Sequence, residues 1–198
     1  MMNYKRIAIF ASGSGTNAEN IIRFFSLHPN MRVELVLSNK KDAPVLEKAH
    51  KYNVKTFTFT KDDFFYNDRV LKILKKEKID FIVLAGFLWL VPTNIVREYP
   101  NRIVNIHPAL LPKYGGKGMY GERVHKAVLE NEENESGITI HYVNEKYDEG
   151  NIILQEKCSV KRGETPESLA SKVHELEYRY YPEIIEKLVS RLDHIHHH

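Results

Sequence analysis

The sequence has very little cysteine and no long apolar run. Cys158 is its single cysteine in 198 residues, so no intrachain disulfide can form and an oxidising compartment is not favoured. No apolar stretch approaches the roughly 20 residues that a bilayer-spanning helix needs, and the amino terminus is too short and polar for a secretory signal. We therefore expect a cytoplasmic protein that does not bind membranes, and a disulfide-stabilised secreted domain is excluded.

Clusters of charge of one sign are also missing. The formal net charge is +3, and acidic and basic residues are interleaved without a long basic arm. This pattern argues against nucleic acid as a partner and suits an anionic small molecule. With 42% hydrophobic residues, the chain is long enough for one well-packed domain, which we expect over residues 1–190. Residues 191–198 contain four histidines and look like a tag, so they are set aside.

Short apolar runs alternate with helical patterns in the first half of the chain. The apolar runs predict strands, and spacings of three and four residues between apolar positions predict helices. Strands are expected at Ile7–Phe10, Val33–Leu37, Lys55–Phe59 and Phe81–Leu84, and helices at Ala18–Phe25, Ala43–Tyr52 and Asp62–Lys76. Strand and helix in turn predict an α/β fold with a mostly parallel, doubly wound, Rossmann-like sheet and helices on both faces.

The second half of the chain changes character after a strand at Ile103–Ile106. A loop rich in proline and glycine is expected at Pro112–Gly121, followed by a helix at Gly121–Glu130. Alternating strands at Gly137–Val143 and Ile152–Val160 predict an antiparallel C-terminal extension of the sheet, joined through the turn Asp148–Asn151. Thr165 and Pro166 predict the cap and first position of a long final helix.

A glycine-rich loop follows the first predicted strand and opens the first predicted helix. It consists of Gly13, Ser14, Gly15, Thr16 and Asn17. Glycine lets the backbone approach a ligand, and a helix amino terminus presents free N–H groups and positive dipole charge. The loop lacks the third glycine of a dinucleotide-binding fingerprint and the Gly-Lys-Ser/Thr end of a Walker loop. It therefore predicts a phosphate site of another kind, with a plain capped turn as the alternative.

Asn105 and His107 are the second chemical signal. They lie two apart at the carboxyl end of a predicted strand, so their side chains share a face at the edge where open α/β sheets bind ligands. An amide donor beside an imidazole suits addition to a carbonyl, in which an oxyanion develops. Asp148, in the following turn region, is a candidate for raising the pKa of that imidazole.

Two other interpretations of this histidine stay open at this point. A single strand histidine is more often structural than catalytic. A metal site made of His107, His141 and Asp148 is also conceivable, but no His-x-His or His-x-x-x-His spacing precedes the tail, and asparagine is a poor zinc ligand. We therefore predict no bound metal.

Four motifs together resemble the phosphoribosylglycinamide formyltransferases, a folate-dependent family of purine synthesis. They are the loop Ala11–Asn17, the segment Leu84–Phe87, the run Asn105–Pro112, and Gly137–His141 followed by Asp148–Gly150. The resemblance extends from Arg6 to about Leu188. Its most specific part is Asn-x-His-Pro followed by Leu-Leu-Pro, which is typical of enzymes that use 10-formyltetrahydrofolate.

The resemblance implies a reaction and a role for each residue. The amine of glycinamide ribonucleotide attacks the formyl carbon of 10-formyltetrahydrofolate, and a tetrahedral oxyanion forms. Asn105 donates a hydrogen bond to this oxyanion, His107 stabilises it as an imidazolium, and Asp148 supports that charge. The ribonucleotide phosphate lies on the Gly13–Asn17 loop, and Glu177 contacts the ribonucleotide, although on its own Glu177 would be interpreted as part of a solvated helix face.

The resemblance also places the folate against two segments. These are Phe87, Leu88, Trp89, Leu90 and Val91, and the loop of Glu145, Lys146, Tyr147, Glu149 and Gly150. Three departures concern this side of the site. Trp89 replaces a basic residue of a well-known family member, the stretch Gly115–Gly121 is longer, and Arg123 lies near the position of an expected histidine, which leaves His125 as a further candidate contact.

Related functions remain as alternatives to the ribonucleotide reaction. The methionyl-tRNA formyltransferase type carries an extra C-terminal domain, and the formyltetrahydrofolate hydrolase type an extra N-terminal one. A length of 198 residues favours the ribonucleotide enzyme, acting on small molecules as a monomer or homodimer. A phosphate sensor without catalysis is the alternative from another class, against which the presence of Asn105, His107 and Asp148 together argues.

Overall fold

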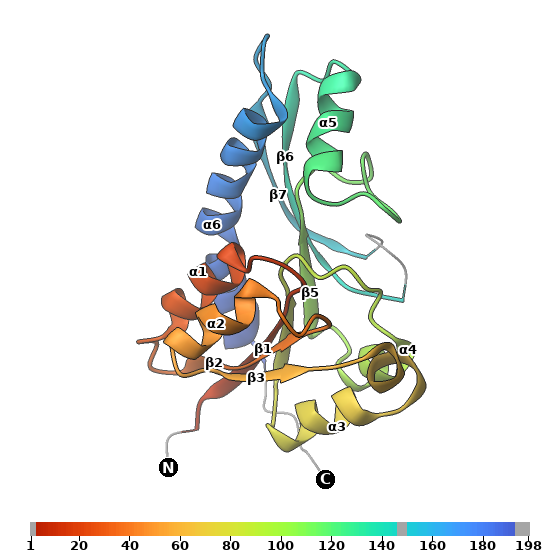
Figure 1. The fold of residues 1–198 in the computed structure, drawn as a ribbon. Helices are drawn as coiled ribbons and strands as arrows, with labels where there is room; N and C mark the ends of the chain where they lie inside the picture. Colours follow the sequence, from red (N-terminus) through yellow and green to blue (C-terminus); the bar gives the residue numbers. More distant parts are fainter. Residues whose placement is uncertain (1–2, 146–149, 193–198) are drawn as a thin grey trace.

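The computed structural model describes residues 3–145 and 150–192, and their strands form one sheet (Figure 1). The sheet has seven strands in the order β3-β2-β1-β4-β5-β6-β7. They are β1 (Lys5–Phe10), β2 (Met31–Ser38), β3 (Lys55–Thr58), β4 (Phe81–Leu84), β5 (Ile103–His107), β6 (Glu135–Tyr142) and β7 (Ile152–Ser159). Strands β1 to β5 pair in parallel, and β6 and β7 pair antiparallel. The predicted mostly parallel sheet with an antiparallel extension is confirmed.

Helices cover both faces of this sheet and give it two cores. One core contains buried residues of α1 (Thr16–Phe25), α2 (Pro44–Lys51), α5 (Glu122–Glu130) and α6 (Pro166–Ser190). The other contains buried residues of α3 (Arg69–Lys76) and α4 (Thr93–Glu98). Alternate residues of β1 point into different cores, with Ile7 and Ile9 in the first and Ala8 and Phe10 in the second. This alternation follows from the two-residue period of a strand.

The order of the strands places a ligand edge in the middle of the sheet. From β1 the chain proceeds outward through β2 and β3, and then returns to the other side of β1 with β4 and β5. Successive strands are therefore added on one side of β1 first and on the other side afterwards, which makes the gap between β1 and β4 a topological switch point. In open α/β sheets, ligands bind at the carboxyl ends of the strands at such a point. The Gly13–Asn17 loop follows β1, and Asn105 and His107 lie on β5, next to β4.

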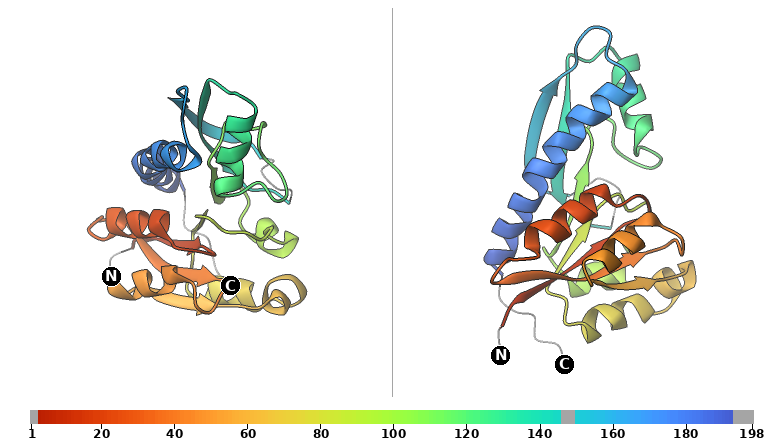
Figure 2. Two further views of the ribbon diagram at one scale, coloured as in Figure 1. Left: turned by 45° about the horizontal axis from the view of Figure 1, so that its top comes forward. Right: turned by 60° about the vertical axis from the view of Figure 1, so that its left-hand side comes forward.

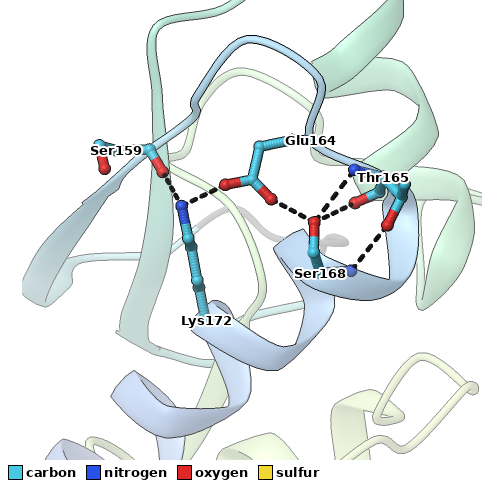
Figure 3. A network of polar contacts seen from close by, with 5 residues as sticks. All are labelled: Ser159, Glu164, Thr165, Ser168 and Lys172. Atoms are coloured by element: carbon cyan, nitrogen blue, oxygen red, sulfur yellow. Dashed lines mark hydrogen bonds and ion pairs between the residues drawn. The ribbon is translucent and has the colours of Figure 1, made fainter.

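Helix α6 begins in a network of polar contacts (Figure 3). Thr165 Oγ1 accepts from the Ser168 backbone N–H at 3.1 Å, and Ser168 Oγ accepts from the Thr165 N–H at 3.0 Å, which is a capping box. Glu164 contacts both Ser168 and Lys172, and Lys172 Nζ also donates to Ser159 O at 3.0 Å. These contacts confirm the predicted cap at Thr165 and tie the start of α6 to the end of β7.

Helix α6 also crosses the molecule and carries a proline in its interior. It runs beside β6 and β7 and reaches α1 (Figures 1 and 2). Pro182 has no N–H, so the Tyr178 carbonyl loses its usual helical donor. Asn20 Nδ2 of α1 donates to that carbonyl at 3.0 Å. The buried Tyr181 hydroxyl donates to Leu84 O at 2.8 Å, so α6 is anchored at two residues of the turn that precedes the proline.

Replacing Asn20 by alanine tests this anchor. The Tyr178 carbonyl would lose its donor in a half-buried position, so we expect the free energy of unfolding to fall by about 1–2 kcal/mol in denaturant titrations. Asn131→Ala is the matched control, because Asn131 Nδ2 donates to Ala127 O of α5 at an exposed helix end. That change should cost about 0.5 kcal/mol or less. Equal losses in the two variants would contradict a special role for Asn20.

Two elements differ from the sequence-based expectation. The single helix predicted over Asp62–Lys76 is wrong: a π-helical turn at Asp62–Tyr66 precedes α3, which begins at Arg69. The interruption buries Phe64 among aromatic rings, with Phe59 at 4.9 Å between centroids. Helix α4 was not anticipated, because six residues are too few for a clear periodicity.

Candidate active site

A cavity of about 810 Å³ opens at the carboxyl edge of β1, β4 and β5. Its wall comes from six parts of the chain: the Gly13–Asn17 loop, residues 84–91, residues 105–108, residues 116–123 with His125, His141 with Val143, and one side of α6. The volume lies within the usual range for small-molecule sites. The two motifs found in the sequence, the glycine-rich loop and the Asn105–His107 pair, therefore border one space.

Gly15 shapes the loop at the start of α1. Its φ is +69°, in the left-handed region, and a Cβ there would lie 2.3 Å from Val45 Cγ2. Gly15 is also the N-cap of α1, and no side chain caps the helix. The first N–H groups of α1 are thus not covered by a cap, and the positive end of its dipole faces the cavity side of the loop. This arrangement suits an anion such as a phosphate.

Asn17 joins this loop to Glu177 of α6. Asn17 Nδ2 donates to Glu177 Oε2 at 3.1 Å, and Glu177 is buried, with 8% of its surface exposed. Asn17 Oδ1 is buried too and has no hydrogen-bond partner within residues 3–145 and 150–192. Carboxylate and amide oxygens are acceptors, so this corner of the cavity suits a ligand that brings hydroxyl donors. A phosphorylated sugar has both groups, the phosphate for the loop and hydroxyls for Asn17 and Glu177.

Asn105 is oriented by its neighbour across the sheet. It pairs with His141 in the β5–β6 register, and Asn105 Nδ2 lies 3.4 Å from His141 Nε2. His141 Nδ1 lies 3.0 Å from the Tyr142 carbonyl, which can only accept. The Nδ1 atom therefore carries a proton, and in the neutral ring Nε2 accepts from the Asn105 amide. Sequence reasoning considered His141 only as a metal ligand and missed this contact, for which the cross-strand pairing is the signal.

His107 is buried at the end of β5, with 4% of its surface exposed. Its Nε2 donates to the Tyr114 carbonyl at 2.6 Å, which holds the ring against the loop that follows. The backbone after His107 is held by Thr139 of β6, whose Oγ1 donates to Ala109 O at 2.7 Å and accepts from Leu111 N at 3.0 Å. The imidazole therefore has a defined orientation beside the cavity.

The wall after β4, formed by residues 85–91, presents backbone groups and aromatic side chains to the cavity. Ser12 Oγ accepts from the Leu88 N–H at 3.0 Å and donates to Asn39 Oδ1 at 2.7 Å, so this wall is tied to β1 and β2. Trp89 packs edge-on against Phe59 at 5.9 Å and beside Phe65 at 5.6 Å between ring centroids. Phe87, Leu88 and Trp89 line the cavity with apolar surface suitable for a flat heterocycle.

Two further histidines border the cavity from α5 and α6. His125 is 3% exposed, and burial lowers its pKa to about 4, with smaller contributions from His174 and His107. The His174 side chain is half-buried, with 49% of its surface exposed, and its Nδ1 lies 3.3 Å from Glu177 Oε1. That hydrogen bond raises the pKa of His174, against an opposing effect of burial. His125 was weighed from the sequence as a contact, whereas His174 was not singled out.

The structure brings most of the predicted site residues together. The cavity is lined by Gly13, Ser14, Gly15, Thr16, Asn17, Phe87, Leu88, Trp89, Leu90, Val91, Asn105, His107 and Glu177. Glu145 instead borders a second, shallower depression that shares Leu90 and Val91. Gly150 packs against the Tyr142 carbonyl, where a Cβ would lie 1.8 Å from the oxygen. Lys146, Tyr147, Asp148 and Glu149 lie outside the described residues.

The stretch before α5, which the resemblance predicts to be longer than in a well-known family member, forms part of the cavity wall. Residues 116–123 line it, and Arg123 Nη1 donates to Gly118 O at 3.4 Å while its guanidinium lies over the Tyr120 ring at 5.1 Å. Arg123 thus supports this loop. Across residues 3–145 and 150–192, no group of three or more His, Cys, Asp or Glu side chains is arranged to hold a metal ion, and no helix is long and apolar enough to cross a membrane.

Fold and cavity define a doubly wound α/β protein in which a glycine-rich loop and an Asn–His pair border one cavity at the switch point of the sheet. The sequence profile of the formyl transferase family matches residues 5–185. The chain belongs to the formyl transferase family. The similarity thus extends over all elements of the sheet and most of α6.

Individual relatives agree with this assignment. The chain is 42% identical over 187 residues to the chloroplastic phosphoribosylglycinamide formyltransferase of Arabidopsis thaliana, covering 91% of this chain and 64% of the relative, so it spans about two thirds of that plant protein. It is 30% identical to the phosphoribosylglycinamide formyltransferase of Bacillus subtilis, covering 93% and 95% of the two chains. The crystal structure of the Bacillus halodurans phosphoribosylglycinamide formyltransferase superposes with a TM-score of 0.83 at 36% identity, covering 96% and 97%.

Proposed function

We propose that this protein transfers the formyl group of 10-formyltetrahydrofolate to the amine of glycinamide ribonucleotide. The observation that carries the proposal is the single cavity bordered by the Gly13–Asn17 loop, the Asn105–His107 pair and the apolar wall after β4. A phosphate site, an oxyanion donor and a heterocycle site within one space suit a reaction that joins a phosphorylated acceptor to a folate donor. The names of the relatives from Arabidopsis thaliana and Bacillus subtilis support the same reaction.

The acceptor is proposed to lie between the loop and α6. Its phosphate would bind the amino-terminal N–H groups of α1, and its ribose hydroxyls would donate to Glu177 and to the buried Asn17 Oδ1. The glycinamide end would then extend toward Asn105 and His107, which border the same cavity. The donor is proposed to place its pteridine against residues 87–91.

In the reaction the acceptor nitrogen forms a bond to the formyl carbon, and the bond between that carbon and N10 of the folate breaks. The amine loses one proton and N10 gains one. Asn105 Nδ2 would donate to the oxyanion of the tetrahedral intermediate, and protonated His107 would stabilise the same charge. Asp148 is proposed to support the imidazolium and to take part in moving the amine proton. These roles match the orientation that His141 gives Asn105.

The decisive experiment is a formyl transfer assay with defined acceptors. The protein is mixed with 10-formyltetrahydrofolate and glycinamide ribonucleotide, and deformylation of the folate is followed optically. We expect turnover that depends on the ribonucleotide. Turnover with water or with initiator tRNA in its place, and none with the ribonucleotide, would sink the proposal in favour of a hydrolase or a tRNA formyltransferase.

Replacing Asn17 by alanine should weaken acceptor binding. The change removes the contact to Glu177 and the acceptor atom Oδ1, so we expect KM for glycinamide ribonucleotide to rise about 5- to 30-fold, the effect of one or two lost hydrogen bonds. The KM for the folate should change less than twofold. Steady-state kinetics with each substrate varied in turn measure both values. A rise confined to the folate KM would contradict the placement of the phosphate.

A further inference from the structure

The Glu177 carboxylate lies between two partners on the cavity wall. Its Oε2 accepts from Asn17 Nδ2 at 3.1 Å, and its Oε1 lies 3.3 Å from His174 Nδ1. His174 is one turn before Glu177 on α6, and both border the cavity. The arrangement Asn17–Glu177–His174 therefore connects the proposed phosphate loop to an imidazole on the opposite side of the carboxylate.

This arrangement has an electrostatic consequence for an anionic ligand. Glu177 is in direct contact with the Gly13–Asn17 loop and carries a negative charge, which repels a phosphate. The loop itself has no cationic side chain. Lys48 of α2, whose Nζ donates to Ser14 O at 2.6 Å, is not among the residues that line the cavity. Because Asn17 links the phosphate loop directly to this carboxylate, a cation close to the carboxylate would favour a phosphate beside it.

We propose that His174 is a positioning residue for the acceptor: its imidazolium neutralises Glu177 and holds the carboxylate toward Asn17, so that a phosphorylated ligand binds beside it. The inference rests on the proposed function in that it takes the Gly13–Asn17 loop as the phosphate site. It adds a residue that none of the sequence motifs contains.

The surroundings of His174 favour its charged form. The hydrogen bond to Glu177 raises the pKa of His174 above its usual value, and burial opposes this effect. His125 faces it from α5 as a neutral ring, because burial holds the pKa of His125 at about 4. The other charged side chains that line the cavity are Glu167 on α6, Glu122 and Arg123 on α5, and Lys117 in the loop before α5. Of the two histidines, His174 is therefore the one that supplies positive charge.

The direction of the pH effect follows from this charge. Because the pKa of His174 is raised above 6.5, most of the ring is protonated at pH 6.5, and the imidazolium is lost as the pH rises through the raised value. Phosphate binding should weaken over the same interval. The ligand itself has the opposite effect, because a phosphate monoester gains its second negative charge near pH 6. A His174→Lys variant, which stays positively charged over the whole range, separates the loss of the imidazolium from the ionisation of the ligand.

The test measures the affinity of ribose 5-phosphate by calorimetry between pH 6.5 and 9, for the full chain and its variants. In the unmodified protein we expect the Kd to rise about tenfold over this range, the effect of one nearby charge. His174→Gln should show the weak affinity already at pH 6.5 and little pH dependence. His174→Lys should bind at least as tightly as the unmodified protein at pH 6.5 and keep that affinity to pH 9, because lysine stays charged.

Two further variants make the test specific to the Glu177 contact. In a Glu177→Gln background the carboxylate charge is gone, so adding His174→Gln should change the Kd less than twofold. His28→Gln is the matched control, because His28 forms a similar pair with Glu186 of α6, with 3.1 Å between Nε2 and Oε2, outside the cavity. That change should leave the Kd unaffected at every pH. Thermal unfolding checks that each variant is folded.

Three results would overturn the inference: equal affinity of His174→Gln and the unmodified protein at pH 6.5, the same pH dependence in His174→Lys as in the unmodified protein, or no binding of ribose 5-phosphate at all. The formyl transfer assay is run separately. Transfer to glycinamide ribonucleotide by a protein whose His174 variants bind ribose 5-phosphate normally would leave the proposed function standing and remove only the role of His174.

Discussion

Replacing His107 by alanine is expected to lower kcat for formyl transfer by about 10²-fold or more. The imidazole is buried at the end of β5 and is proposed to stabilise the charge that develops in the transition state, an effect of this size in other enzymes. The KM values should change little, because substrate binding is proposed to depend on the phosphate loop, Glu177 and residues 87–91. Steady-state kinetics with both substrates, together with single-turnover rates, measure the effect.

The controls for His107 separate chemistry from structure. His107 Nε2 also donates to the Tyr114 carbonyl, so its loss could disturb the loop that follows. His107→Asn keeps a donor at this position but has no imidazolium, and it should be nearly as slow as His107→Ala. His50→Ala removes an exposed histidine that contacts Thr56 and should have full activity. An active His107→Asn variant would show that the contact to Tyr114, and not the charge, is what the reaction needs.

Replacing Gly15 by alanine should both destabilise the fold and abolish tight acceptor binding. The added Cβ would lie 2.3 Å from Val45 Cγ2, and a φ of +69° is unfavourable for alanine. Left-handed strain costs roughly 1–2 kcal/mol and overpacking of this kind roughly 1–3 kcal/mol, so we expect a loss of about 2–5 kcal/mol in the free energy of unfolding. Chemical denaturation measures this loss, and calorimetry with the ribonucleotide measures binding.

Gly13→Ala is the matched control in the same loop. A Cβ at Gly13 would meet no atom within 4 Å, and its φ is not positive. We expect a change in stability of about 0.5 kcal/mol or less, as for an exposed position without special geometry. If Gly13→Ala destabilised the protein as strongly as Gly15→Ala, the contact with Val45 would not explain the requirement for glycine.

Much of the fold was predictable because local patterns and tertiary structure agree. The apolar runs of β1 and β4 are buried on both faces in the structure, as strands in the middle of a parallel sheet must be. The prediction failed over Asp62–Lys76, where apolar spacing continued through a π-helical turn. There the packing of Phe64 between Phe59 and Phe87 outweighs helical regularity, and this packing joins residues that are distant in the chain.

By itself the sequence determined that a glycine-rich loop follows a buried strand, that Asn105 and His107 lie two apart at a strand end, and which family these motifs resemble. Such features depend on residues close together in the chain, where strand period and helix capping apply directly. Only the tertiary structure decided that His141 orients Asn105, that Glu177 reaches Asn17, and that His174 pairs with Glu177. Except for the last pair, these contacts join residues 36 or 160 positions apart. The His174–Glu177 pair is local in sequence, but it reaches the phosphate loop only because α6 packs against α1.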